Sequence, residues 1–253
     1  MVKIYNKDQG IGYAPLPKIS PYSKIEKSRL ANPKFTFRFA SQLVKKESKI
    51  DTNFTLLDLG CANGEFLYFL RDEFPQAVLH GLDITPEFIS IATKLLKEKK
   101  QVELNVGDIF SHKGSYDVVF CMGTTPIFPD LSKFISAMIP MLNPGGVCVV
   151  DGLFNKYDCD VRLEYKDTSK NKDDLWRSDF NIHSEKTIQE IISKFQNIEV
   201  EFFHPPFDSE IKQLKSSPDV NVWTFKDQEG NNIITSGLRQ FLNPSFFTLR
   251  KNE

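Results

Sequence analysis

Short apolar runs alternate with helix-like segments along most of this chain, beginning at Phe54. The runs have the length of strands and are rich in β-branched residues, whereas the segments between them repeat apolar side chains at helical spacing. This alternation predicts an α/β fold with a mostly parallel sheet and helices on both faces. We expect strands at residues 55–59, 78–84, 102–106, 116–122 and 147–152, with helices at 33–47, 64–73, 86–99 and 131–142.

The two ends of the chain depart from this pattern. Residues 1–31 lack a sustained period and contain several prolines, which predicts an extended arm. Near the C-terminus we expect a helix at 184–195 capped by Ser184, strands at 198–203 and 246–250, and a hairpin turning at 229–232. The 253 residues are therefore predicted to form one domain, with the arm at 1–31, the core at 32–207 and 245–253, and an insertion at 208–244.

Charge and composition exclude some classes of partner. The 32 basic and 33 acidic residues leave a net charge of −1, so no global attraction to nucleic acid or anionic membrane is expected. The N-terminus lacks the apolar core of a signal peptide and no run approaches the length of a membrane span, which predicts a cytoplasmic protein. The cysteines lack metal-binding spacing and are expected to be reduced thiols.

The first predicted strand ends in Asp58 and leads into a turn of small residues, with glycines at 60 and 64. A turn of this kind, at the carboxyl end of a strand in an open α/β sheet, offers backbone N–H groups to a nucleotide-like ligand. The spacing differs from the dinucleotide fingerprint, because Gly60, Ala62 and Gly64 stand at offsets 0, 2 and 4 rather than 0, 2 and 5. Glu65 stands where a phosphate-binding loop needs a lysine, so phosphate binding is the poorer interpretation.

The segment Asp58-Leu59-Gly60-Cys61-Ala62-Asn63-Gly64 resembles the first motif of the class I S-adenosylmethionine-dependent methyltransferases, with Ala62 in place of the second glycine. The similarity continues in order. Asp83, followed by Ile84, matches the acid that accepts the ribose hydroxyls, and Asp108 with Ile109 matches the residues at the adenine edge. Cys121 lies where a backbone carbonyl meets the amino group of the ligand.

This resemblance implies a Rossmann-like fold whose seven-stranded, mostly parallel sheet ends in an antiparallel strand. It also implies S-adenosylmethionine as cofactor and S-adenosylhomocysteine as product. The cofactor-binding residues expected from it are Asp58, Gly60, Cys61, Ala62, Gly64, Asp83, Ile84, Asp108, Ile109 and Cys121. Structural alternatives remain, since Asp58 and Asp83 suit capping of a turn and of a helix, and Asp108 suits a turn.

The residues on the acceptor side carry no comparable motif. An alcohol acceptor must lose its proton during methyl transfer, whereas an ionised oxygen needs only a well-placed cation. His183, just before a predicted helix, is the candidate general base, although helix capping or a surface position explains it equally well. His204 is a second candidate, and Arg29, Arg38 and Arg239 are candidates for holding an anion.

We expect a metal-independent methyltransferase that modifies an oxygen of a small polar acceptor, such as a sugar, a phosphate or a related metabolite. Residues 123–128 lack the Asp/Asn-Pro-Pro-aromatic motif of nitrogen methylation, and Asp151-Gly152 does not reproduce the acidic pair of the metal-dependent catechol enzymes. The insertion that carries Trp223 resembles a segment of some bacterial methyltransferases of capsule modification. The alternatives are an NAD-binding oxidoreductase and a catalytically silent S-adenosylmethionine-binding module.

Overall fold

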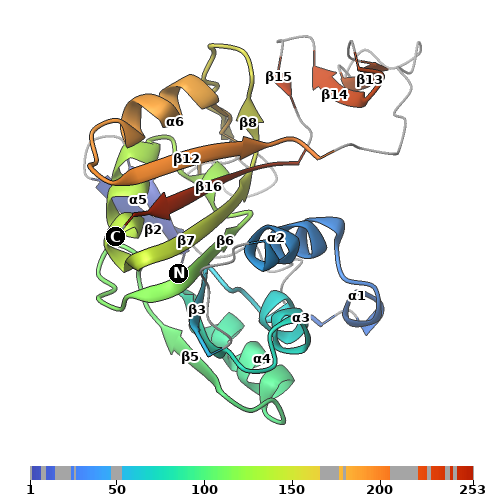
Figure 1. Cartoon of the computed structure of the whole chain (residues 1–253), viewed down its shortest axis with the longest axis vertical. Coiled ribbons are helices and arrows are strands. Elements are labelled where there is room, and N and C mark those ends of the chain that lie inside the picture. The colour runs from blue at the N-terminus through green and yellow to red at the C-terminus, as the bar shows by residue number, and fades with distance from the viewer. Residues whose placement is uncertain are drawn as a thin grey trace, which may run out of the picture.

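A seven-stranded sheet forms the centre of the molecule (Figure 1). The computed structural model describes residues 2–6, 10–14, 24–25, 27–46, 53–165, 177–178, 181–205, 222–226, 229–236, 240–241 and 244–252. In spatial order the strands of the sheet are β12 (Ile198–Phe203), β16 (Ser245–Lys251), β7 (Leu142–Gly152), β6 (Tyr116–Met122), β3 (Thr55–Leu59), β4 (Val78–Asp83) and β5 (Val102–Val106).

The direction of these strands confirms the predicted architecture. Strands β3 to β7 pair in parallel, and β16 runs antiparallel to both of its neighbours, β7 and β12. Because parallel strands end at one edge of the sheet, the carboxyl ends of β5, β4, β3, β6 and β7 form a single row. This row is where a ligand is expected in an open α/β sheet.

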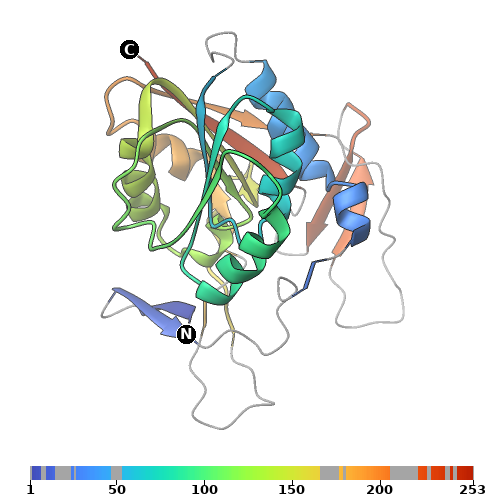
Figure 2. The same cartoon turned by 90° about the horizontal axis from the view of Figure 1, so that it is seen from below.

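Helices cover both faces of the sheet (Figures 1 and 2). On one face, α2 (Phe35–Lys45), α3 (Glu65–Glu73) and α4 (Pro86–Leu96) pack on the strands, and on the other face α5 (Leu131–Met138) and α6 (Glu185–Ile192) do so. Successive strand residues point to opposite faces, so Phe120 joins the first core and Val119 the second. Both faces are therefore buried, as the near-continuous apolar strands predict.

The largest differences from the predicted boundaries lie at the end of α5 and the start of β7. Helix α5 stops at Met138 and continues as a 3₁₀ turn, Ile139–Met141, because Pro140 cannot donate the next helical hydrogen bond. Strand β7 begins at Leu142 rather than at 147, because Leu142 already pairs with Tyr116 across an irregular register. Asn143-Pro144-Gly145-Gly146 lies within this irregular part of β7. The crossover at residues 107–115 contains no helix.

The peripheral segments are more regular than the sequence predicted. The arm contains an antiparallel hairpin of β1 (Val2–Asn6) and β2 (Gly10–Ala14), followed by α1 (Lys27–Ala31). In the insertion, β13 (Val222–Lys226) and β14 (Asn232–Ser236) form the predicted hairpin, and β15 (Gln240–Phe241) adds a third strand. This small sheet lies apart from the main one in Figure 1, and residues 208–221, 227–228, 237–239 and 242–243 of the insertion lie outside the described part of the chain. None of the described helices is long and apolar enough to cross a membrane.

Candidate functional site

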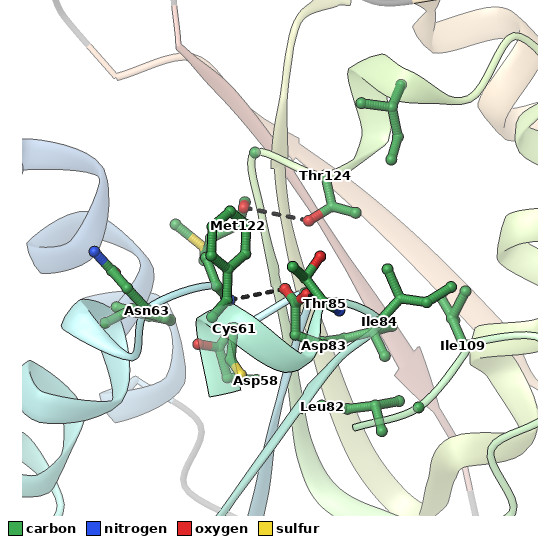
Figure 3. A pocket seen from close by; sticks show the side chains of 18 of the residues that line it. Asp58, Cys61, Asn63, Leu82, Asp83, Ile84, Thr85, Ile109, Met122 and Thr124 are labelled. Atoms are coloured by element: carbon green, nitrogen blue, oxygen red, sulfur yellow. Dashed lines mark hydrogen bonds between the residues drawn. The ribbon is translucent and has the colours of Figure 1, made fainter. Parts of the chain in front are cut away.

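A cavity of about 390 Å³ opens at the carboxyl ends of β3, β4 and β6, a volume typical of small-molecule sites (Figure 3). Most of the cofactor-binding residues predicted from the sequence line it, namely Asp58, Gly60, Cys61, Ala62, Asp83, Ile84, Asp108 and Ile109. Gly64 and Cys121 do not. The Cys121 side chain is fully buried in the core, and its neighbour Met122 lines the cavity in its place.

The turn after β3 depends on two glycines with positive φ. Gly60 (φ 82°) and Gly64 (φ 81°) adopt the left-handed conformation that other residues rarely take. A Cβ atom at Gly60 would lie 2.5 Å from Oγ1 of Thr124, and one at Gly64 would lie 2.9 Å from Cβ of Ala92. Gly60 thus lets the loop after β6 approach the cavity, and Gly64 lets α3 pack closely on α4.

Asp83 joins the ends of two neighbouring strands. Its Oδ2 accepts a hydrogen bond of 2.9 Å from the N–H of Ala62, and its Oδ1 accepts one of 2.8 Å from the N–H of Thr85. Burial raises the pKa of Asp83, although these two N–H groups act in the opposite direction. A carboxylate has about four acceptor positions, so the two oxygens retain capacity for the hydroxyls of a ligand. Asp83 therefore fits both the helix-cap and the ribose-binding interpretation.

Asp58 is a buried acid that no described residue compensates. Its side chain lies against the cavity and the residue is only 2% exposed. Burial, and then the nearby charge of Asp83, raise the pKa of Asp58 to about 8. Within the described residues, no hydrogen bond or ion pair reaches its carboxyl group, so the predicted turn-capping alternative finds no support. A cationic group of a ligand would favour the ionised form of this acid.

Part of the N-terminal arm contacts the turn after β3, residues 60–64, and the first residue of α3, Glu65. The side-chain amide of Asn63 donates to the carbonyl oxygen of Lys24 at 3.2 Å and to Oε1 of Glu65 at 3.2 Å. Arg29 lies with Nη1 3.8 Å from Oε2 of Glu65, which is itself buried. Arg29 is therefore paired with an acid that lines the cavity, and this pairing does not support its predicted role as an anion-holding residue.

The other predicted anion-holding residues do not line the cavity either. The guanidinium of Arg38 donates to the carbonyl oxygen of Pro33, and Arg239 lies outside the described residues. Among the described residues, Lys34 is the only basic side chain in the lining. Its ammonium lies 5.3 Å from the centre of the Phe37 ring, at the start of α2. No motif marks Lys34, and only the packing of α2 on the sheet reveals its position.

The remaining wall of the cavity is largely apolar. The side chains that form it come from α2, α3, α4 and the loops after β5 and β6, and they are Phe37, Phe66, Phe88, Phe110, Met122, Ile127 and Phe128. Thr124 Oγ1 lies 3.5 Å from the carbonyl oxygen of Met122, at the contact with Gly60 (Figure 3). Asp108 Oδ1 accepts a hydrogen bond of 3.2 Å from the N–H of Phe110, which agrees with the turn-forming alternative for Asp108.

The predicted general base, His183, lies away from the cavity. The residue is 4% exposed, and its Nε2 lies 2.9 Å from the carbonyl oxygen of Phe128, to which the neutral ring donates. Burial lowers the pKa of His183, which keeps the ring neutral. His183 therefore supports Phe128, which lines the cavity, and does not itself reach the lining.

The second histidine candidate is also engaged elsewhere. His204 Nε2 lies 2.6 Å from Oε1 of Glu185, and His204 is absent from the lining. Across the described residues, no group of three or more His, Cys, Asp or Glu side chains is placed to hold a metal ion.

Comparison with known proteins agrees with this geometry. A family model described as "Methyltransferase domain" matches residues 50–202. The chain is 30% identical over 95 residues to trans-aconitate 2-methyltransferase of Deinococcus radiodurans, a match that covers 38% of this chain and 36% of that protein. Such matches thus span little more than a third of the length of the curated relatives.

Two solved structures share the fold. The YcgJ protein of Bacillus subtilis superposes with a TM-score of 0.56 at 15% identity, over 85% of this chain and 99% of that one. An S-adenosylmethionine-dependent methyltransferase of Clostridium acetobutylicum gives a TM-score of 0.56 at 14% identity, over 88% and 94% of the two chains. At these identities the likeness establishes the architecture alone.

Proposed function

Because the chain belongs to the methyltransferase domain family, we propose that it transfers the methyl group of S-adenosylmethionine to a small molecule. The observation that carries this proposal is the buried carboxyl group of Asp58, which faces the cavity without a partner among the described residues. A buried acid of this kind is costly unless a cation compensates it. S-adenosylmethionine, when bound, supplies a methyl group on a cationic sulfur and an ammonium group.

The residues around Asp58 fit the other parts of this cofactor. We assign Asp83 to the ribose hydroxyls, for which its carboxylate oxygens retain acceptor capacity. Asp108 and Ile109, which line the cavity next to β5, are assigned to the adenine edge. Gly60, Cys61 and Ala62 bring the backbone close to the ligand, and Gly64 acts through the packing of α3 on α4.

Electrostatics favour a neutral acceptor. The acidic side chains Asp58, Glu65, Asp83 and Asp108 line the cavity with one basic side chain, Lys34, among the described residues. A phosphate or carboxylate would find one cation, Lys34, in the described lining, whereas a neutral hydroxyl group needs none. We therefore propose O-methylation of a hydroxyl on a small polar molecule. The matched relative acts on trans-aconitate rather than on a sugar or a phosphate, so neither of those classes nor a role in capsule modification gains support.

Isothermal titration with S-adenosylhomocysteine and with NAD tests the cofactor assignment. We expect S-adenosylhomocysteine to bind and NAD not to bind. Asp58→Ala should weaken S-adenosylhomocysteine binding by about tenfold or more, since hydrogen bonds to charged groups are typically worth about 1.5–3 kcal/mol. Asp158→Asn, which changes an exposed acid paired with Lys186, is the matched control and should bind as the wild type does. Tight NAD binding without S-adenosylhomocysteine binding would favour the oxidoreductase alternative.

Turnover distinguishes an enzyme from a silent binding module. Incubation with S-adenosylmethionine that carries a radiolabelled methyl group, together with a pool of small metabolites, should move the label into a new product. Intact S-adenosylhomocysteine binding without any transfer across hydroxyl-bearing metabolites would favour the module.

A further inference from the structure

Asp151 stands next to the cavity, one strand beyond its lining. It is the penultimate residue of β7 and lies in register with Met122 of β6 and with Phe246 of β16. Met122 lines the cavity. The Asp151 backbone therefore belongs to the same row of carboxyl ends as Asp58 and Asp83, but lies further toward the β16 side.

The side chain of Asp151 lies on the face of the sheet that α2 covers. Residues alternate between faces along β7, and Val147 and Val149 pack in the core formed with α2 and α3. Asp151 follows Val149 by two residues and so shares its face. Burial raises the pKa of Asp151 to about 7, against the smaller opposing effect of the charge of Lys34, at the start of α2. The N–H of Gly152 also bonds to the Asp151 carboxylate.

The order of the strands gives the direction in which the acceptor lies. The assigned adenine residues follow β5, the ribose acid ends β4, and the acid that faces the cofactor ammonium lies at the end of β3. In spatial order the next strands are β6 and β7. The ends of β6 and β7, at Met122 and Asp151, are therefore the part of the row that the cofactor assignment leaves for the acceptor.

We propose that Asp151 is the proton acceptor for the hydroxyl group that is methylated, and that the charge of Lys34 favours the ionised form of Asp151. This inference rests on the proposed function. In the step, the acceptor oxygen forms a bond to the methyl carbon as the carbon–sulfur bond breaks and its electron pair stays on sulfur. The hydroxyl proton moves to the Asp151 carboxylate, and S-adenosylhomocysteine leaves neutral at sulfur.

The charges around Asp151 suit this role. A base works best when its pKa is close to the working pH, and burial brings the pKa of Asp151 into that range. Lys34 offsets the charge of the carboxylate, so the pair together neither repels nor attracts a neutral hydroxyl strongly. Asp151 thus has the role of general base for which the sequence suggested His183. The His183 ring instead donates a hydrogen bond to the carbonyl oxygen of Phe128.

Sinefungin serves as a probe for the charge that faces the methyl group of the cofactor. In this analogue of S-adenosylmethionine, a carbon that bears a protonated amine replaces the methyl-bearing sulfur, so its ammonium marks the position of the methyl group. S-adenosylhomocysteine carries no charge there. The ratio of the two dissociation constants, measured by isothermal titration, therefore reports the charge that faces the methyl position.

Two substitutions should move this ratio in opposite directions. Asp151→Asn should weaken sinefungin binding by about tenfold while S-adenosylhomocysteine binding stays within about twofold. At a pH high enough to keep Asp151 ionised, Lys34→Met should improve sinefungin binding relative to S-adenosylhomocysteine by several-fold, because it removes a neighbouring cation. Asp158→Asn is the matched control and should leave the ratio unchanged, because its side chain is exposed and paired with Lys186. Equal loss of both ligands in Asp151→Asn, or no change in the ratio, overturns the inference.

Turnover tests the proton transfer itself. In the labelled-methyl assay, Asp151→Asn should lower the rate by about 10²–10⁴-fold, the usual contribution of a general base. A rate close to that of the wild type would show that Asp151 takes no proton. If the wild type fails to bind S-adenosylhomocysteine, the proposed function itself fails. If it binds and only the Asp151 effects are missing, this inference fails alone.

Discussion

At the scale of single residues, two acids at neighbouring strand ends differ in how they are satisfied. Asp83 receives two backbone N–H groups, whereas Asp58 receives no partner from the described residues. Burial raises the pKa of both groups, and the charge of Asp83 raises that of Asp58 further, to about 8. Asp58 is therefore mostly protonated near neutral pH and must lose its proton when a cation binds beside it.

The affinity for S-adenosylhomocysteine should depend on pH through Asp58. With a pKa of about 8, the ionised fraction of Asp58 rises nearly tenfold from pH 6 to pH 7, and the affinity should rise with it. The α-ammonium of the ligand, with a pKa of about 7.7–8.0, stays protonated over this interval. Isothermal titration at the two pH values measures the effect. Asp58→Asn should bind weakly and without this dependence, and a flat wild-type profile would exclude Asp58 as the ammonium partner.

Some residues of the site could be predicted from the sequence and others could not. Asp58, Asp83 and Asp108 were predicted from the resemblance to the methyltransferase motifs, and the parallel sheet brings them together near the carboxyl ends of β3, β4 and β5. Lys34 and Asp151 carry no motif, and their proximity arises only when α2 packs on β7. For His183, the sequence does not reveal that the ring points to the carbonyl oxygen of Phe128, and the residue is absent from the cavity lining.

At the scale of elements, the turn after β3 and the loop after β6 fit against each other. Gly60→Ala should destabilise the fold for two reasons, namely its positive φ, worth about 1–2 kcal/mol, and the clash with Thr124, worth about 1–3 kcal/mol. Urea unfolding measures the sum. The double variant Gly60→Ala, Thr124→Ala should recover only the second part.

A substitution at Gly145 separates the cost of the positive φ from the cost of the steric clash. Gly145 also has a positive φ, of 77°, but a Cβ atom there would meet nothing within 4 Å, so Gly145→Ala should cost only the conformational part. If Gly60→Ala and Gly145→Ala prove equally destabilising, the contact with Thr124 makes no steric contribution.

The start of α6 depends on one hydroxyl group. Ser184 Oγ accepts a hydrogen bond of 3.1 Å from the N–H of Thr187, the cap that the sequence predicted. Ser184→Ala should lower the free energy of unfolding by about 1 kcal/mol. Ser193→Ala, at the other end of α6, removes an exposed hydroxyl that bonds to the Glu190 carbonyl and should cost less. An equal loss in both variants in urea unfolding would argue against a specific capping effect.

Local patterns predicted most elements well and failed where pairing is long-range. The apolar runs of β3, β5, β6 and β12 gave their observed bounds. The early start of β7 depends on the pairing of Leu142 with Tyr116, which no local pattern encodes. The hairpin of β1 and β2 escaped prediction because its pairing joins residues that lack a strand-like apolar period.

At the scale of the whole molecule, histidines with lowered pKa values make the folded state less stable at acidic pH. Burial lowers the pKa of His183 below its ordinary value of 6.5, so between the two values the unfolded chain binds the proton and the folded chain does not. The contribution of the neutral His183 ring to the free energy of unfolding is therefore complete above pH 6.5. It is lost as the pH falls toward the folded-state pKa. His112 and His204 act in the same direction, whereas the raised pKa values of Asp58 and Asp151 act in the opposite one.

A substitution isolates the histidine effect. His183→Gln keeps a donor for the carbonyl oxygen of Phe128 but does not titrate. The stability of the wild type relative to this variant should fall from pH 7.5 to pH 5.5, by at most about 1.4 kcal/mol per pH unit between the two pKa values. Urea unfolding at both pH values measures this difference. A difference that stays constant with pH would mean that the His183 ring is protonated equally in both states.

The two hydrogen bonds that Asp83 accepts affect the kinetics of ligand binding. The bond from Ala62 fixes the turn after β3 to the end of β4 before any ligand arrives, and the bond from Thr85 holds the Asp83 carboxylate in place. The ligand then meets a turn already in its bound shape, and its capture needs no slow loop closure at that point. In stopped-flow experiments the observed rate should rise linearly with ligand concentration, without the plateau that a preceding conformational step imposes.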